Sequence, residues 1–316
     1  MSGTFDPALP PPKCIVVAGP TATGKTAFAV ELARRLSGEI VNADSMQVYR
    51  GMDVGTAKPD HAERKGIPHH LLDVAAPDEP FNAAVYRRLA MPVIMDICSR
   101  GKACFVVGGT GLYIRALLGG LMTAPPSDAG LRARLRAQCD ALGTSRLHHR
   151  LVRLDPAYAQ KVHPNDRVRI IRGLEIIQLT GQVPSQLMED HGFTDQTVKC
   201  LKICLHVDRN RLYDRINART ETMVEKGLIR ETKALLKEGY SPDLKPMKAI
   251  GYRHMIRYLN GTWTLEQATE RLKRDTRRYA KRQLTWFRAE PDMIWLTPDA
   301  MGAALTRITS FLVETA

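Results

Sequence analysis

A glycine-rich turn near the start of the chain has the residue types and spacing of a phosphate-binding loop. Residues 13–26 read KCIVVAGPTATGKT, and an amphipathic segment follows them. Glycines let successive backbone N–H groups converge on an anion, and the start of a following helix adds unpaired donors and partial positive charge. Lys25 would supply an ammonium group, and the Thr26 hydroxyl would hold Mg²⁺. The predicted phosphate site consists of Gly19, Pro20, Thr21, Ala22, Thr23, Gly24, Lys25 and Thr26.

The acid that could act opposite this turn is Asp44, which follows the apolar segment GEIVNA. A P-loop ATPase or helicase needs a second strand that ends in an acidic residue, but the segment KACFVVGG runs into Thr110 instead. In a small-molecule kinase, Asp44 would bind the acceptor hydroxyl or the metal. In a transferase that releases diphosphate, it would take a proton from the nucleophile. A helix N-cap or a salt bridge is its ordinary structural role, but Ser45 and Gln47 after it could hydrogen-bond a base edge.

Composition and charge limit the class of protein. The 316 residues are 44% hydrophobic and 25% charged, as in a globular protein with a substantial core. The net charge of +13 and the pI near 9.6 favour a polyanionic partner. No apolar segment approaches the length of a membrane span, and the N-terminal residues lack the basic and apolar regions of a secretory signal. We therefore expect a cytoplasmic protein that does not contact membranes.

The six cysteines, at positions 14, 98, 104, 139, 200 and 204, include no CxxC pair. Several lie in apolar runs, as buried reduced thiols do, which agrees with a reducing compartment. Cys200, Cys204 and His206 could suggest a metal site, but apolar residues alternate with them in the rhythm of a core strand. The histidine pairs at 69–70 and 148–149 lack cysteine or acidic partners at ligand spacing, so no zinc site is expected.

Alternating apolar segments and helical patterns indicate how the candidate residues are positioned. Strand-like runs read KCIVVA, GEIVNA, KACFVVGG, LKICLHV and DMIWLT, and helical patterns separate most of them. This alternation predicts an α/β fold, with a P-loop doubly wound parallel sheet whose ligand lies at the carboxyl ends of the strands. The turns GPTATGKT, NADSMQ and VVGGTGLY would then face the ligand.

One section of the chain breaks this alternation. Residues 123–195 contain Arg-rich helical patterns and no convincing strand, and they begin with a proline-rich stretch at 124–127. We expect an all-helical insertion domain there, which divides the P-loop core into a first part, residues 1–122, and a second part, residues 196–316. Residues 1–13 are expected to form a flexible lead-in.

The last part of the core is predicted to be helical and basic. In the segment TERLKRDTRRYAKRQLTWFR, helical spacing gathers basic residues on one arc and apolar residues on the other side. The arc consists of Arg274, Arg277, Arg278, Lys281, Arg282 and Arg288, and the other side of Leu272, Tyr279, Ala280 and Phe287. A solvated charged face is the ordinary interpretation. Two basic surfaces beside a phosphate pocket, this arc and the insertion, favour a nucleic-acid cleft.

Seven motifs together resemble the bacterial tRNA dimethylallyltransferase (IPP transferase) family. They are GPTATGKT, NADSMQVYRGMDVGTAKP, IPHHLLD, VVGGTGLY, HPNDRVRIIRGLE, MKAIGYRHM and YAKRQLTWFR, in this order, between about residue 14 and residue 296. The second motif is far more specific than a P-loop alone. The resemblance implies transfer of a dimethylallyl group from dimethylallyl diphosphate to the exocyclic amine of the adenine just 3′ of the tRNA anticodon, with Mg²⁺ as cofactor.

The resemblance also implies roles for individual residues. The phosphate turn would hold the diphosphate leaving group rather than ATP, with Mg²⁺ on Thr26 and Arg253 as a further cation. Asp44 would be the general base, and Thr110 would position the adenine and the diphosphate. The anticodon stem-loop would be the partner of a monomeric protein. The tRNA-contacting residues implied are Asp44, Ser45, Met46, Gln47, Thr110, Arg132, Arg167, Val168, Arg169, Ile170, Ile171, Arg172, Lys248, Ala249, Ile250, Gly251, Tyr252, Arg253, Lys281, Arg282, Gln283, Leu284, Thr285, Trp286, Phe287 and Arg288.

Two other classes stay open. A P-loop small-molecule kinase would consume ATP and release ADP. An RNA-binding protein whose P-loop serves as a switch would hold a nucleotide without turnover. Neither class accounts well for the missing second acidic strand end together with the run Asp44-Ser45-Met46-Gln47.

Overall fold

The computed structural model describes residues 11–122, 124–191 and 197–314, in which the chain divides into two compact units. The first unit joins the residues up to Leu118 with those from Thr197 onward, and the second comprises Gly119–Gln196. Most of the predicted N-terminal lead-in lies outside the described residues. Within the described ranges, no helix has the length and apolarity needed to cross a membrane.

One sheet organises the first unit. In its described residues, six parallel strands pair in the order β3-β2-β4-β1-β5-β6. They are β1 (Lys13–Ala18), β2 (Glu39–Asn42), β3 (His69–His70), β4 (Cys104–Val107), β5 (Lys199–Leu205) and β6 (Met293–Leu296). The predicted α/β fold with a parallel sheet is confirmed, and all five predicted strands are present. The edge strand β3 was missed because two residues are too few to show a pattern.

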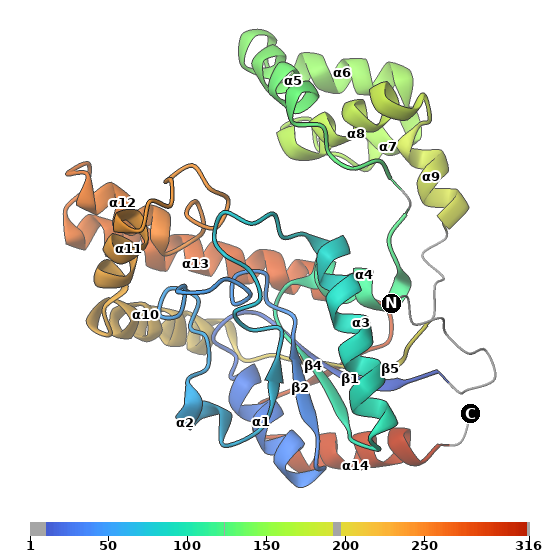
Figure 1. Cartoon of the computed structure of the whole chain (residues 1–316), viewed down its shortest axis with the longest axis vertical. Helices are drawn as coiled ribbons and strands as arrows, with labels where there is room; N and C mark the ends of the chain where they lie inside the picture. The colour runs from blue at the N-terminus through green and yellow to red at the C-terminus, as the bar shows by residue number, and fades with distance from the viewer. Residues whose placement is uncertain (1–10, 123, 192–196, 315–316) are drawn as a thin grey trace. The chain divides into compact units, whose positions relative to one another are not determined.

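Helices cover the two faces of this sheet (Figure 1). On one face, α1 (Lys25–Arg35) and α14 (Met301–Val313) pack against the strands, where Phe28, Leu32 and Ile308 join the sheet's apolar side chains in one buried core. On the other face lies α3 (Ala83–Ser99), followed along the chain by α4 (Gly111–Gly119). Tyr86 of α3 stacks on Tyr113 of α4 with the ring centroids 4.6 Å apart. The two central strands β1 and β4 are buried almost throughout, as expected for a sheet covered on both faces.

A second group of helices stands at the carboxyl ends of the strands. It consists of α2 (His61–Arg64), α10 (Arg209–Glu225), α11 (Leu228–Lys237), α12 (Tyr252–Leu259) and α13 (Leu265–Arg288). The starts of the two longest are capped by side chains: Asp208 accepts backbone N–H groups at the start of α10, and Thr264 forms a capping box with Gln267 at the start of α13. These caps fix where the helices that wall the site begin.

The second unit has its own core. Its described elements are α5 (Ala129–Leu142), α6 (Thr144–Leu154), α7 (Pro156–Gln160), α8 (Arg167–Thr180) and α9 (Pro184–His191). Leu135, Leu151, Ile170 and Leu174 are buried in a single apolar cluster. Such a core is what an independently folding helical domain requires.

Candidate active site

The carboxyl ends of β1, β2 and β4 bring three turns around one cavity of about 400 Å³. The phosphate turn follows β1, the turn that carries Asp44 follows β2, and the Gly-Gly-Thr turn follows β4. The sheet order places β4 between β1 and β2, so the three turns are neighbours. Residues of α10, α12 and α13 complete the wall. The cavity thus lies at the edge of the sheet where a doubly wound fold binds its ligands.

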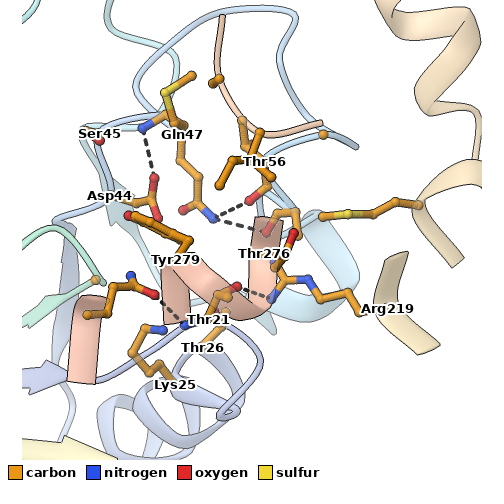
Figure 2. Close-up of a pocket in the computed structure, with 18 of the residues that line it drawn as sticks. Thr21, Lys25, Thr26, Asp44, Ser45, Gln47, Thr56, Arg219, Thr276 and Tyr279 are labelled. Atoms are coloured by element: carbon orange, nitrogen blue, oxygen red, sulfur yellow. Dashed lines mark hydrogen bonds between the residues drawn. The ribbon is translucent and has the colours of Figure 1, made fainter. Parts of the chain in front are cut away.

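The phosphate turn has a backbone shape suited to an anion. Ala22 (φ 64°) and Gly24 (φ 93°) are both left-handed, and α1 begins at Lys25. The Lys25 ammonium donates to the Pro20 carbonyl at 2.8 Å. The side chains of Lys25 and Thr26 both line the cavity (Figure 2). The N-terminus of α1 and this ammonium therefore face the same space.

The remaining residues of the turn hold its shape. Thr23 is fully buried, and its hydroxyl donates to the Pro20 carbonyl at 2.9 Å. A Cβ atom at Gly19 would lie 2.5 Å from the Leu205 carbonyl oxygen, so the turn passes too close to β5 for any larger residue. The backbone N–H of Thr21 is directed to α13, where it donates to the side-chain oxygen of Gln283.

Arg219 of α10 reaches the same turn, and sequence reasoning missed it. Its guanidinium donates to the Thr21 hydroxyl at 3.3 Å and lines the cavity (Figure 2). Burial, together with repulsion by Arg219, lowers the pKa of Lys25 to about 8, although Asp44 opposes the shift. A signal was available, because Arg219 is seven residues after Leu212 and three after Ile216, on the buried face of its helix.

Asp44 lines the cavity beside the residues of the phosphate turn. One carboxylate oxygen accepts the Met46 N–H at 2.8 Å, and the Asp44 N–H donates to the Asn42 side chain at 3.0 Å. Asn42 is buried and also donates to the Leu71 carbonyl, so the turn is fixed from behind. Asp44 caps no helix and forms no salt bridge within the described residues. The ordinary structural roles that we considered for it are therefore not the ones it has.

Thr110 ties the three turns together. Its hydroxyl accepts the Ser45 N–H at 2.9 Å, and its N–H donates to the Ala43 carbonyl at 3.2 Å. The Tyr279 hydroxyl of α13 hydrogen-bonds the Thr110 side chain, and burial raises the pKa of that tyrosine. Our sequence analysis placed Tyr279 on the apolar side of its helix, but its ring lies in the cavity next to Asp44 (Figure 2).

Gln47 is held by the loop that follows its own turn. Its side-chain N–H groups donate to the carbonyls of Thr56 and Ala57 at 3.2 and 3.1 Å (Figure 2). That loop is anchored in turn by Glu231 of α11, whose carboxylate accepts the backbone N–H groups of residues 53–55 at 2.7–3.0 Å. The Tyr252 hydroxyl donates to the same carboxylate at 2.6 Å. Because both N–H groups of Gln47 are satisfied, its amide oxygen is the atom available to a ligand.

The stretch 248–253 contributes unevenly to the cavity. Lys248 is exposed and Tyr252 is fully buried, although both residues line the cavity. Arg253 is also a lining residue, but its guanidinium pairs with Asp275 of α13 at 2.6 Å. The same carboxylate lies 3.2 Å from the His254 ring. Ala249, Ile250 and Gly251 form the turn that leads into α12.

The stretch 281–288 of α13 alternates between exposed and buried residues. Lys281, Arg282, Thr285 and Arg288 are exposed, Leu284 and Trp286 are partly buried, and Gln283 and Phe287 are buried. The Arg282 guanidinium stands over the Tyr279 ring and lines the cavity.

The basic arc on α13 is less uniform than we predicted. Arg277 donates to Asn217 of α10 at 2.6 Å, so it packs between helices rather than facing solvent. Asp275 lies within the arc and pairs with Arg274 at 3.3 Å and with Arg278 at 3.7 Å. The spacing of the sequence could not reveal these partners, because they come from other elements or from the helix's own acid.

In the second unit, the implied tRNA contacts are also of two kinds. Val168 is 79% exposed and Arg169 is exposed, whereas Ile170 and Ile171 are buried in the core of the unit. Arg167 pairs with Asp140.

Arg132 and Arg172 both bind Glu175, a carboxylate with 0% exposure that also accepts the Asp128 N–H. The structure therefore gives these two arginines a defined place beside a buried counter-ion.

The charges around the cavity define the class of protein. Lys25 and Arg219 are partly buried, and within the described residues their side chains bond to a carbonyl and a hydroxyl but form no salt bridge. Cations without counter-ions are costly when they are removed from water, so this pair is typical of an anion site. A carboxylate, Asp44, lines the same cavity. Together these features describe a P-loop α/β enzyme that binds a phosphorylated substrate and holds a proton acceptor next to it.

Comparison with known proteins agrees with this class and narrows it. The family model described as IPP transferase matches residues 47–290. The tRNA dimethylallyltransferase 2 of Geotalea uraniireducens is 51% identical over 300 residues, which cover 95% of this chain and 97% of that protein. The tRNA dimethylallyltransferase of Geobacter sulfurreducens is 51% identical over 284 residues, covering 90% and 91%. This chain therefore belongs to the IPP transferase family.

Solved structures give the same result. The tRNA isopentenylpyrophosphate transferase of Bacillus halodurans superposes with a TM-score of 0.71 at 43% identity and covers 95% of this chain and 96% of its own. A eukaryotic dimethylallyltransferase acting on tRNA superposes with a TM-score of 0.80 at 30% identity, covering 95% and 79%. The kinase alternative is not favoured by any of these relatives, and the enzyme is a prenyltransferase.

Proposed function

We propose that this enzyme transfers a dimethylallyl group from dimethylallyl diphosphate to the exocyclic amine of the adenine 3′-adjacent to the anticodon in tRNA, with release of diphosphate. The observation that supports this most directly is the pair of cations without carboxylate partners, Lys25 and Arg219, in the described part of the cavity that Asp44 also lines. A leaving diphosphate needs the cations, and a poorly nucleophilic amine needs the carboxylate.

The phosphate turn holds the leaving group in this proposal. As the bond between the allylic carbon and the diphosphate oxygen breaks, negative charge grows on the diphosphate. The N-terminus of α1, Lys25 and Arg219 are already oriented toward the cavity, and such preorganised donors stabilise developing charge without reorganisation.

A divalent cation fits the residues present. No cluster of three or more His, Cys, Asp or Glu side chains that could hold a metal occurs among the described residues. Mg²⁺ does not require one, because it is commonly held by one or two protein oxygens together with substrate phosphates and water. The Thr26 hydroxyl lines the cavity at the start of α1 and would be that protein oxygen. When bound, Mg²⁺ would neutralise charge on the diphosphate.

The acceptor side of the cavity is built for a base. The lone pair of an adenine amine is delocalised into the ring, so the amine attacks well only if its proton is accepted, and Asp44 is the acceptor that we propose. Thr110 would orient the base, and the Gln47 amide oxygen would accept from a base N–H group. A base stacked in an anticodon loop must be flipped out to reach this depth.

The tRNA itself would be held by exposed basic residues. Lys248, Lys281 and Arg288 surround the cavity's helices on the first unit, and Arg169 is exposed on the second. Buried members of the implied stretches, such as Ile170 and Phe287, would support the contacts rather than make them. Since one chain supplies the phosphate turn, Asp44 and Thr110, we propose a monomer that acts on tRNA in the cytoplasm.

A direct assay tests the function. Purified protein, Mg²⁺, dimethylallyl diphosphate and an unmodified tRNA should give dimethylallyl-adenosine in the tRNA without ATP, as measured by nucleoside analysis. A strict requirement for ATP with release of ADP would instead identify a kinase. Tight nucleotide binding with no product would identify a switch.

The lowered pKa of Lys25 predicts a pH dependence of diphosphate binding. A bound anion favours the protonated amine, so affinity should not depend on this group below about pH 8 and should fall as the pH rises above it, by about tenfold per pH unit. Calorimetry with inorganic diphosphate and Mg²⁺ measures this. Lys25→Arg is the control, because a guanidinium stays charged and any pH effect of the diphosphate itself is shared. Parallel curves for the two proteins would contradict the prediction.

Neutralising exposed basic residues of α13 should weaken tRNA binding without regard to base sequence. Arg278 has a side chain that is 64% exposed, and Lys281 is also exposed. In the double variant Arg278→Gln/Lys281→Gln, the slope of log affinity against log salt should fall by about 0.7–0.9 for each tRNA phosphate that the protein no longer neutralises. The matched control is Arg34→Gln on α1, another exposed arginine with an acidic neighbour. An unchanged slope in the double variant would show that these two side chains are only solvated.

A further inference from the structure

Gln283 is buried between the two turns that carry the donor site and the acceptor site. It is 6% exposed, on α13. Its amide oxygen accepts the Thr21 N–H of the phosphate turn at 3.0 Å, and its amide N–H donates to the Gly109 carbonyl of the neighbouring turn at 2.9 Å. One side chain therefore connects residues that are far apart in the sequence and adjacent in the cavity wall.

The orientation of this amide is fixed by its partners. Rotating the amide by half a turn would set its N–H groups against the Thr21 N–H and its oxygen against the Gly109 oxygen, so both contacts would become repulsive. The amide is buried with the two backbone groups, and removing it would leave polar groups unsatisfied. The bridge therefore has one orientation in which both hydrogen bonds form.

The glycines of the Gly-Gly-Thr-Gly turn are what let α13 come this close. A Cβ atom at Gly109 would lie 2.3 Å from the amide nitrogen of Gln283, and a Cβ atom at Gly111 would lie 2.1 Å from the indole nitrogen of Trp286. One helical turn earlier on the same face of α13, Tyr279 hydrogen-bonds Thr110. The helix therefore holds this turn at two successive points.

We propose that Gln283 is a positioning residue that sets the distance between the diphosphate on the phosphate turn and the base held by Thr110 and Asp44. This inference rests on the proposed function. A buried side chain with both ends engaged does not contact tRNA itself, so its effect on alkylation passes through the two turns. Because reacting groups must meet at near-contact distance, a shift of about 1 Å between the turns costs roughly 100-fold in rate.

Two substitutions remove the bridge in different ways. Gln283→Met keeps the length of the side chain and removes both hydrogen bonds. Gln283→Asn keeps the amide, but it is one methylene too short to reach both turns. The matched control is Thr232→Val on α11, which removes a buried hydroxyl whose hydrogen bond, to the Leu228 carbonyl at 2.8 Å, stays within its own helix.

We expect both Gln283 variants to lower single-turnover alkylation by roughly 10- to 100-fold. Dissociation constants for inorganic diphosphate with Mg²⁺ and for tRNA should change by less than about threefold, because each turn keeps its own binding groups. Amide hydrogen exchange should quicken in peptides that contain Thr21 and Gly109 while the rest of α13 and the sheet stay protected. Thr232→Val should match the wild type in rate and in the exchange of these peptides.

Three results would overturn the proposal. Alkylation by Gln283→Met within about twofold of the wild type would show that the bridge does not matter. A loss of diphosphate affinity as large as the loss of rate would make Gln283 a part of the phosphate site alone. Faster exchange throughout the sheet would make it a residue of the fold. Failure of the wild type to alkylate tRNA would refute the proposed function instead, while the exchange data would still report on the bridge.

Discussion

Replacing Asp44 by Asn is expected to lower the single-turnover alkylation rate by about 10²–10⁴, the usual contribution of a positioned general base. Asparagine keeps the size of the side chain and an oxygen that can accept the Met46 N–H, which Asp44 accepts at 2.8 Å. The turn should therefore keep its shape while the proton-accepting charge is removed. Rapid quench with radiolabelled donor measures the rate, and the dissociation constants of tRNA and donor should change only a few-fold.

The control for this prediction is Asn42→Ala, which removes the side chain that holds the Asp44 turn from behind. Asn42 accepts the Asp44 N–H and donates to the Leu71 carbonyl, so its loss should disturb folding stability and ligand binding together. If Asp44→Asn shows that combined pattern, Asp44 has a structural role. Near wild-type alkylation by a folded Asp44→Asn enzyme would show that another group, such as the departing diphosphate, takes the proton.

The parts of the site that the sequence predicted are those formed by single short turns. The phosphate turn and Asp44 each follow an apolar strand directly, and parallel strands bring such turns to one edge of the sheet by topology alone. The local pattern therefore contained the fold and two walls of the cavity. It could not contain the order of β4 between β1 and β2, which makes the turns neighbours.

The parts that were missed come from helices late in the chain. Arg219 and Gln283 lie 198 and 262 residues from Thr21, to which both hydrogen-bond. Helical periodicity shows which residues share a face, but it does not show which turn that face meets. The resemblance placed Gln283 in a tRNA-binding stretch, and only the three-dimensional packing reveals that its amide is engaged inside the protein.

The same limit explains the arginines of the second unit. Sequence shows Arg132 and Arg172 as members of an Arg-rich segment, and Glu175 as one acid within a helix. Their pairing needs α5 and α8 to pack together, which brings both guanidinium groups onto a carboxylate with 0% exposure. A charge that is satisfied inside a domain and a charge that is offered to RNA look alike in a sequence.

Replacing Arg219 by Gln is expected to lower kcat/KM for dimethylallyl diphosphate by about 10²–10³, as the removal of one charge-stabilising donor does at other sites. Arg219 lines the cavity and donates to the Thr21 hydroxyl, and it has no carboxylate partner within the described residues. Its charge is therefore available to the leaving group. Burial lowers the pKa of this guanidinium, which shows that the protein surroundings disfavour the very charge that an anion would stabilise.

The comparison of Arg219→Gln with Arg219→Lys separates charge from geometry. Lysine restores a cation but not the planar pair of donors, so it should recover only part of the rate. Removing the guanidinium also relieves repulsion on Lys25, so Arg219→Gln should raise the pKa of Lys25 and move the bend in diphosphate affinity to higher pH. The thermal stability of the variant without ligand should stay level or rise, because a buried charge without a counter-ion has been deleted. A variant that loses stability and leaves kcat/KM for the donor intact would show that Arg219 braces the turn through Thr21 and does not bind the diphosphate.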